Sequence, residues 1–299
     1  MSSDKKSKAL ENLDQGAYDL YDEYVHSDMS RRNFLSRISV FATAGLTAAA
    51  IADFMLPKYV EATQVQPTDS RLRSEMVEYT SVKGAGVMKG LLSRPANAGK
   101  KLPGIIVVHE NRGLNPHIED VARRAGLANF IAFAPDVLTP LGGYPGTDDK
   151  GKVLQKKRDK DEMLQDFIAA YYFLKTHPEC NGHVGVVGFC FGGSIANKMA
   201  VQLPDLGASV PFYGGQPKGD DVAKIKAPLL LHFAALDKRV NKGWPDYKAA
   251  LEKHNKNFTA YMYENVNHGF HNDTTPRYDK ASAELAWNRS IDFFNQHLR

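Results

Sequence analysis

The sequence is poor in cysteine, and its charges are close to balanced. It contains two cysteines, Cys180 and Cys190, and their spacing matches neither a disulfide framework nor a Cys-x-x-Cys redox motif. The formal net charge is +4, and the basic cluster at residues 156–160 is interrupted by Asp159. Such a cluster is typical of a solvated helix face, so we expect no nucleic-acid-binding module.

Long hydrophobic runs and internal repeats are also absent. The most apolar segment, residues 38–56, is rich in small residues and carries Asp53. Because a transmembrane helix needs about 20 strongly apolar residues, we expect no permanent membrane span. The composition, 43% apolar and 24% charged residues, is that of an ordinary globular protein with one hydrophobic core.

Strand and helix patterns alternate from residue 75 to the end of the chain. The expected strands are residues 75–81, 86–93, 104–109, 130–134, 183–188, 208–212, 229–233 and 259–263. Helices are expected at residues 118–128, 159–176, 191–203, 242–255 and 281–297, and a loop at 138–151. This alternation predicts a single α/β domain with a doubly wound, mainly parallel sheet that opens with an antiparallel pair.

The most informative segment is residues 186–193, with the sequence VVGFCFGG. An apolar strand ends in Gly-x-Cys-x-Gly and leads into a helix, which is the layout of the nucleophile elbow of α/β-hydrolases with a thiol in place of a hydroxyl. Glycines on both sides admit a strained turn, and the helix N-terminus favours a thiolate. Cys190 is therefore the candidate nucleophile. The alternative is a buried cysteine in a glycine-rich turn.

Two later segments supply a candidate acid and base. Asp237 follows the expected strand 229–233, and His268 lies in a loop after the strand 259–263. The chain order nucleophile, acid, histidine fits an α/β-hydrolase, and the carboxyl ends of parallel strands share one edge of the sheet. We therefore predict a triad of Cys190, Asp237 and His268, although His271 is a second histidine nearby.

Together with residues 107–114, VVHENRGL, these motifs make residues 79–298 resemble the dienelactone hydrolase family. The resemblance implies hydrolysis of a small ester or lactone through a thioester, with no metal or other cofactor. It also implies that Glu110 contacts the resting thiol. The backbone N–H groups of Phe191 and Asn111 would form the oxyanion hole.

One position departs from the family pattern. Asn272 stands where the best-known members carry an arginine that binds the substrate carboxylate, and an amide cannot replace a guanidinium there. We consider Arg112, Arg158 and Asn272 as substrate-binding candidates, with Arg239 and Arg277 as further candidates for an anion site. The alternatives to a dienelactone-type substrate are a broad carboxylesterase or thioesterase, or a non-catalytic periplasmic binding protein.

The N-terminal segment carries a second signal. Residues 30–35, SRRNFL, match the twin-arginine export pattern and precede the apolar run. We therefore expect residues 1–62 to be a leader cleaved after Ala62 and recognised by the twin-arginine export machinery, and residues 63–299 to be a periplasmic or exported hydrolase domain. Apolar residues recur at helical spacing over 10–24, which predicts a short amphipathic helix. The alternative to a leader is an amphipathic or core helix preceded by a chance arginine pair.

Overall fold

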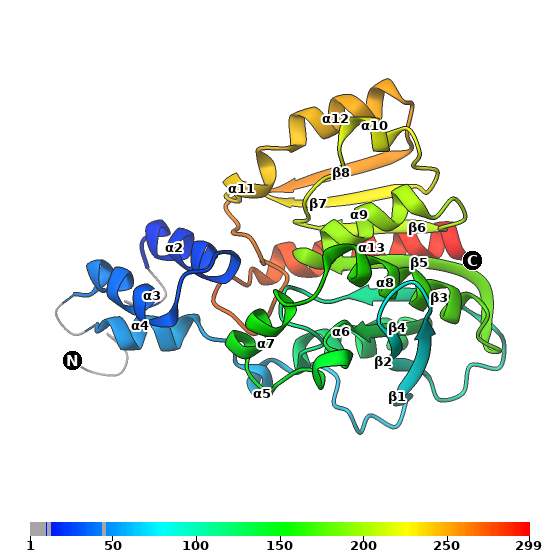
Figure 1. Ribbon diagram of the computed structural model, residues 1–299, viewed down its shortest axis with the longest axis horizontal. Helices are drawn as coiled ribbons and strands as arrows, with labels where there is room; N and C mark the ends of the chain where they lie inside the picture. Colours follow the sequence, from blue (N-terminus) through cyan, green and yellow to red (C-terminus); the bar gives the residue numbers. More distant parts are fainter. Residues whose placement is uncertain (1–9, 11–12, 44–45) are drawn as a thin grey trace.

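The computed structural model describes residues 10, 13–43 and 46–299. The expected leader is therefore described except for residues 1–9, 11–12 and 44–45, which lie outside the described residues. A large α/β body carries a small group of N-terminal helices at one end (Figure 1). The two parts meet near the helix labelled α7 in that view.

The body is built on one eight-stranded sheet of order β1-β2-β4-β3-β5-β6-β7-β8. Its strands are β1 (Leu72–Ser81), β2 (Gly86–Pro95), β3 (Leu102–Val108), β4 (Ile131–Asp136), β5 (Cys180–Phe189), β6 (Ala208–Phe212), β7 (Leu229–Ala234) and β8 (Phe258–Tyr263). Strands β1 and β2 are antiparallel to their neighbours, and the other strands pair in parallel. The predicted doubly wound, mainly parallel sheet is confirmed.

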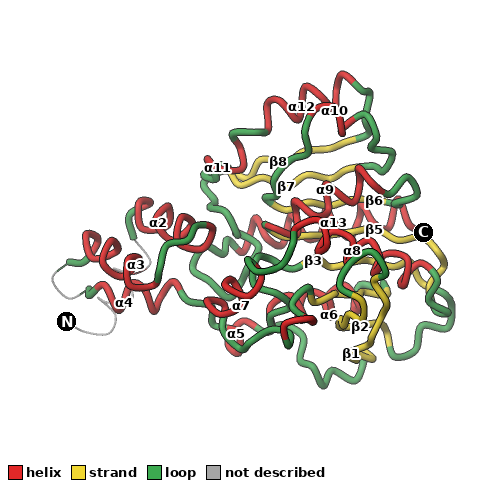
Figure 2. The backbone as a smooth tube through the Cα atoms, in the orientation of Figure 1, coloured by secondary structure: helices red, strands yellow, loops and turns green. Residues whose placement is uncertain are grey.

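Helices cover both faces of this sheet and bury two apolar layers (Figure 2). One layer packs α6 (Pro116–Leu127) and α13 (Lys280–Leu298) against the sheet. The other packs α8 (Lys160–Lys175), α9 (Phe191–Gln202), α10 (Gly219–Val222) and α12 (Trp244–Lys253). Because both faces are covered, the central strands are continuous apolar runs rather than alternating ones.

One local prediction was wrong, and one short helix was not predicted. The expected loop at 138–151 contains the 3₁₀-helix η2 (Thr139–Leu141) and the start of α7 (Asp148–Gln155), whose first turn carries two acids. The expected helix at 242–255 is α12, and a break separates it from the preceding short helix α11 (Lys238–Asn241), which was not expected. The break occurs because a proline in the first turn of α12 starts a new helix and cannot continue the previous one.

The N-terminal helices have a small core of their own. They are α2 (Gln15–His26), α3 (Arg31–Ile38), the 3₁₀-helix η1 (Ser39–Phe41), α4 (Ala48–Met55) and α5 (Tyr59–Ala62). The apolar faces of α2, α3 and α4 form a separate cluster, and α2 confirms the predicted amphipathic helix. Within the described ranges, no helix has both the length and the apolar character needed to cross a bilayer.

Candidate active site

Cys190 occupies a tight turn between β5 and α9. Its backbone is at φ 58° and ψ −110°, a strained conformation that is held only where the surroundings fix it. A Cβ atom added at Gly188 would lie 2.0 Å from the Gly192 carbonyl oxygen, and one at Gly192 would lie 2.2 Å from the Val108 oxygen. The glycines are therefore required for the turn, and the start of α9 lies directly against the end of β3.

Asp237 and His268 form a buried pair at the same edge of the sheet. Asp237 caps α11 by accepting a hydrogen bond from the Val240 N–H at 3.0 Å, and its other oxygen lies 2.5 Å from His268 Nδ1. Burial lowers the pKa of His268, but the Cys190 thiolate and the Asp237 carboxylate outweigh burial and raise that pKa to about 10. His268 Nε2 is buried without a hydrogen-bond partner among the described groups, so it remains available to exchange a proton.

The thiol of Cys190 is held in its ionised form. Burial raises the pKa of Cys190, but the nearby imidazoles of His26 and His268 outweigh burial and lower that pKa to about 5. At neutral pH the group is therefore a thiolate, which is the nucleophilic form of cysteine. The other cysteine, Cys180, is buried and free at the far end of β5, and burial raises the pKa of its thiol.

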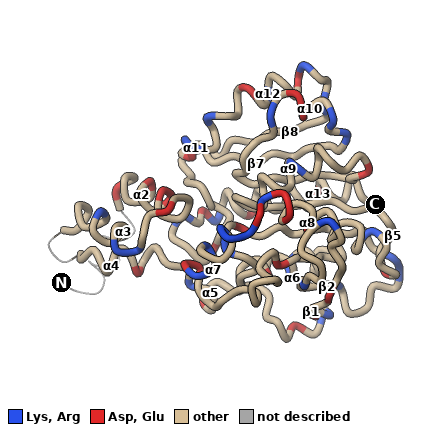
Figure 3. Tube along the Cα trace, in the orientation of Figure 1, with Lys and Arg blue, Asp and Glu red and all other residues tan. Residues whose placement is uncertain are grey.

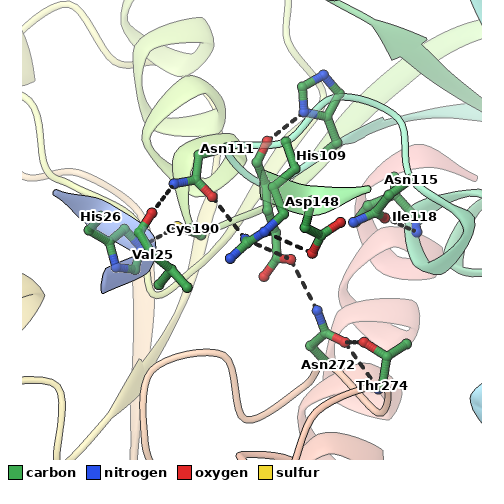
Figure 4. A network of polar contacts seen from close by, with 12 residues as sticks. Val25, His26, His109, Asn111, Asn115, Ile118, Asp148, Cys190, Asn272 and Thr274 are labelled. Atoms are coloured by element: carbon green, nitrogen blue, oxygen red, sulfur yellow. Dashed lines mark hydrogen bonds and ion pairs between the residues drawn. The ribbon is translucent and has the colours of Figure 1, made fainter. Parts of the chain in front are cut away.

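His26 is the site residue that the sequence did not reveal. It ends α2, and its Nε2 lies 3.0 Å from Cys190 Sγ (Figure 4). Its ring packs edge-on against that of His268, with centroids 4.7 Å apart. The apolar spacing of α2 predicted the helix, but no local signal could indicate that its last residue contacts the nucleophile. The alternative histidine His271 stacks on Phe189 in the core instead.

Hydrogen bonds hold the C-terminal turn of α2 against the body. Asn111 Nδ2 donates to the Val25 carbonyl at 2.8 Å, and Lys152 Nζ donates to the Tyr24 carbonyl at 2.8 Å. The Tyr24 hydroxyl donates to Asp149 at 2.5 Å. The last carbonyl groups of a helix have no partners inside the helix, so the body supplies partners for those of α2.

Glu110 is buried near the site, but its carboxylate is occupied. Its Oε2 accepts a hydrogen bond from Asn272 Nδ2 at 3.0 Å and lies 3.9 Å from Arg112. Burial raises the pKa of Glu110, but Arg112 and the neighbouring cations outweigh burial and lower it. Among the described residues, no hydrogen bond joins Glu110 to Cys190. The carboxylate is instead held by Asn272 and Arg112, so the contact with the resting thiol that the resemblance implied stays a prediction.

The two expected oxyanion-hole residues lie at adjacent strand ends. Phe191 opens α9, where a helix leaves its N–H groups unpaired. Asn111 follows β3, which pairs in parallel with β5. The Asn111 side chain hydrogen-bonds to the Val25 carbonyl and to Arg112, so this side chain is occupied, and the oxyanion role of the backbone N–H stays a prediction.

The candidate arginines divide into two groups. Arg112 lies 2.8 Å from Asp148, and Arg158 pairs with Asp166 at 2.7 Å and with Glu162 at 3.0 Å. Their guanidinium groups are thus taken up by internal ion pairs, which gives no support to substrate binding by Arg158.

Arg239 and Arg277 lie beside the triad and α2. Arg239 is 3.2 Å from Asp22, and Arg277 is buried 3.6 Å from the same carboxylate. These groups line a pocket of about 290 Å³ together with Asp237 and His268, and Cys190 is not among the residues that line it. Several acidic residues of α2 lie on this side of the molecule (Figure 3).

By residue type, the cluster that could hold a metal ion is His26, Cys190 and His268, whose candidate ligand atoms lie within 4.8 Å of one another. However, Arg239 Nη2 lies 3.2 Å from His26 Nε2 and 3.2 Å from His268 Nδ1. A permanent positive charge at that distance opposes a divalent cation. The arrangement therefore suits a charged thiolate better than a metal.

Comparisons with known proteins show the family and the fold. Residues 88–298 match the model of the dienelactone hydrolase family, and residues 5–42 match a separate model, YqhI-like. "Putative hydrolase fragment YghX" of Escherichia coli is 52% identical over 114 residues, which cover 38% of this chain and 97% of that protein. "Protein usf" of Aquifex pyrophilus is 34% identical, over 75% of this chain and 99% of that protein.

A solved structure titled "Putative Dienelactone Hydrolase from Klebsiella pneumoniae" superposes with a TM-score of 0.66 at 27% identity, covering 75% of this chain and 99% of that one. The matched region includes the whole sheet from β3 onward and the elbow. The chain therefore belongs to the dienelactone hydrolase family and is a hydrolase of the α/β-hydrolase fold.

Proposed function

We propose that the protein hydrolyses a small ester or lactone through a triad of Cys190, His268 and Asp237. The observation that carries this proposal is a thiol with a pKa of about 5 at a strained elbow, beside a histidine held 2.5 Å from a buried carboxylate. A thiolate, an imidazolium and an orienting acid are the three groups that covalent acyl transfer requires.

The reaction begins when the Cys190 thiolate attacks the carbonyl carbon of the substrate. The oxyanion so formed accepts hydrogen bonds from the backbone N–H groups of Phe191 and Asn111. Collapse of this intermediate breaks the C–O bond, and the His268 imidazolium gives its proton to the departing oxygen. In a lactone, that oxygen stays tethered to the acyl group as a hydroxyl.

Deacylation uses the same groups in reverse. Neutral His268 removes a proton from water, and the hydroxide attacks the thioester carbonyl. The thiolate leaves as the acid product forms, which restores the thiolate–imidazolium pair. Asp237 keeps Nδ1 of His268 protonated throughout, so that Nε2 exchanges the proton.

The substrate class follows from the groups near the elbow. Asn272 is bonded to Glu110 and offers no guanidinium to a substrate carboxylate. This supports a second candidate function, that of a carboxylesterase or thioesterase that prefers small neutral esters over carboxylated lactones. The two candidates share the triad and differ only in specificity.

The test compares p-nitrophenyl acetate with dienelactone, using the full chain and its Cys190→Ala variant. We expect turnover that the variant loses, and a ratio of kcat/KM values that favours the neutral ester. Cys180→Ala is the matched control, because Cys180 lies at the opposite end of the same strand, and it should keep full activity. Equal activity of Cys190→Ala and the full chain would contradict the triad.

The arginine pair at residues 31–32 supports a second proposal, export to the periplasm by the twin-arginine route. These arginines open α3, which Ser30 caps. Fractionation of cells that carry the full chain should find it in the periplasm, and the double change to lysine should retain it inside. An unchanged distribution would contradict export. The N-terminal sequence of the exported protein would test cleavage after Ala62, which stays a prediction.

A further inference from the structure

Two histidines flank the thiol of Cys190, one from each part of the molecule. His268 comes from the body, and His26 comes from α2. His26 Nε2 lies 3.0 Å from Cys190 Sγ. Its Nδ1 lies 2.8 Å from the Asp22 carbonyl oxygen and 3.1 Å from the Asp22 carboxylate. Both ring nitrogens therefore have partners. The oxygens at Nδ1 make that atom a donor, so Nε2 donates to the sulfur only when the ring is an imidazolium, although Arg239 Nη2 also lies 3.2 Å from this nitrogen.

The surroundings favour a charge pair between the sulfur and this imidazole. Burial lowers the pKa of His26, but the Cys190 thiolate and the Asp22 carboxylate outweigh burial and raise it. The charged and titratable groups that face the cluster are Asp22, Glu110, Asp237, His268, Arg239 and Arg277. Asp22, Glu110 and Asp237 balance part of the positive charge of the two arginines. The thiolate–imidazolium pair therefore lies among charged groups of both signs and not in apolar surroundings.

The contact between His26 and Cys190 depends on several interactions that hold α2 against the body. Two hydrogen bonds from the body hold the carbonyl groups of Tyr24 and Val25, directly before His26. Arg277 lies over the Tyr21 ring, 4.8 Å from its centroid. Lys238 lies 3.7 Å from Asp19. Bonds on several sides of α2 therefore fix where its last residue lies.

We propose that His26 is a residue of the catalytic centre, which donates its Nε2–H to the Cys190 thiolate and keeps the resting nucleophile ionised. Residues 13–62 would then form part of the active site of the hydrolase, which requires that they stay attached to the body and excludes the cleavage after Ala62 expected from the sequence. The proposal rests on the proposed function, because it takes Cys190 as the nucleophile.

In this proposal, His26 and His268 carry out two different tasks in the reaction. In a single-histidine centre, one imidazole must both stabilise the thiolate and protonate the leaving group. Here His26 contacts the sulfur at 3.0 Å, while His268 also lowers the pKa of the thiol but has no geometric hydrogen-bond partner at Nε2 among the described groups. His268 is thereby left to give its proton to the departing oxygen.

The test measures the pH dependence of Cys190 alkylation by iodoacetamide in the full chain, a reaction that needs no substrate. We compare the unchanged protein with His26→Gln and His26→Ala. His183→Ala is the matched control, because His183 is exposed at the opposite end of β5. The ultraviolet absorbance of the thiolate gives a second reading, and Cys180 stays silent in it because its pKa is raised.

We expect both His26 variants to shift the midpoint of alkylation upward from about pH 5, and His183→Ala to leave it unchanged. A shift of two pH units would reduce the thiolate fraction, and the alkylation rate, about tenfold at about pH 6. The Gln variant keeps most of the bulk of His but carries no charge. If the alkylation midpoint shifts upward in both His26→Gln and His26→Ala, the shift therefore reports the loss of the imidazolium charge and not greater access of iodoacetamide to the thiol.

Three results would count against the idea. An unchanged midpoint with faster alkylation at every pH would mean that His26 only covers the thiol. A variant identical to the unchanged protein would mean that the contact has no role. A midpoint near that of an ordinary thiol in the unchanged protein would instead overturn the proposed function, since Cys190 would not be an activated nucleophile.

Discussion

Asp237→Asn separates the catalytic role of this residue from its structural one. Asp237 Oδ1 caps α11 at 3.0 Å, and Oδ2 lies 2.5 Å from His268 Nδ1. Asparagine is as good a helix cap as aspartate, so the first contact survives. The second contact cannot survive unchanged, because the amide nitrogen is a donor and would face another donor at Nδ1.

The expected loss of activity follows from that mismatch. His268 must either turn or adopt the other tautomer, which places its proton on Nε2 and removes the base for deacylation. Loss of the carboxylate also lowers the pKa of His268, since Asp237 is one of the groups that raise it. We expect kcat for p-nitrophenyl acetate to fall by about 10³ to 10⁴-fold.

The effect on folding should be small in comparison. The free energy of unfolding, measured in urea at neutral pH, should fall by about 1–3 kcal/mol, because one buried charge-assisted hydrogen bond is lost and His268 can become neutral. Asp246→Asn is the matched control, because Asp246 is exposed in the first turn of α12. A kcat within tenfold of that of the unchanged protein would refute the assignment of Asp237 as the orienting acid.

Three further predictions concern pH, an ion pair and the elbow. The kcat/KM profile should rise through about pH 5 as Cys190 ionises and fall through about pH 10 as the His268 imidazolium loses its proton. Arg158→Ala should lower the free energy of unfolding by about 3–5 kcal/mol, since it leaves the fully buried Asp166 carboxylate without its partner. Gly188→Ala should prevent accumulation of soluble protein, since its Cβ would overlap a backbone oxygen at 2.0 Å.

A contradicting result is defined for the pH profile, and a control variant for each of the two substitutions. A profile that rises only above about pH 8 would show an ordinary thiol. Lys157→Ala removes an exposed neighbour of Arg158 and should leave urea unfolding unchanged. An equal effect of the two changes would contradict the importance of the buried pair. Gly86→Ala is a glycine change in open space, although its positive φ of 82° makes a modest loss of stability the expected result.

Much of the fold, and the residues of the candidate triad, could be predicted because the signals are local. Runs of apolar residues specify the central strands, and the glycines around Cys190 specify a turn that only small residues permit. Asp237 and His268 each follow a strand, and parallel strands end at a common edge. A pattern of this kind predicts which side chains lie at the same edge of the sheet, but it does not give the distances between them.

The sequence by itself therefore determined the sheet, the elbow and the order of the three candidate catalytic groups. Only the tertiary structure decided which long-range partners those groups meet. His26 and Cys190 are 164 positions apart, and Asn272 and Glu110 are 162 apart. No periodicity spans such separations, because these contacts arise when separately formed elements pack together. The packing of α2 on the body thus brings an N-terminal histidine to the thiol, which local propensity could not specify.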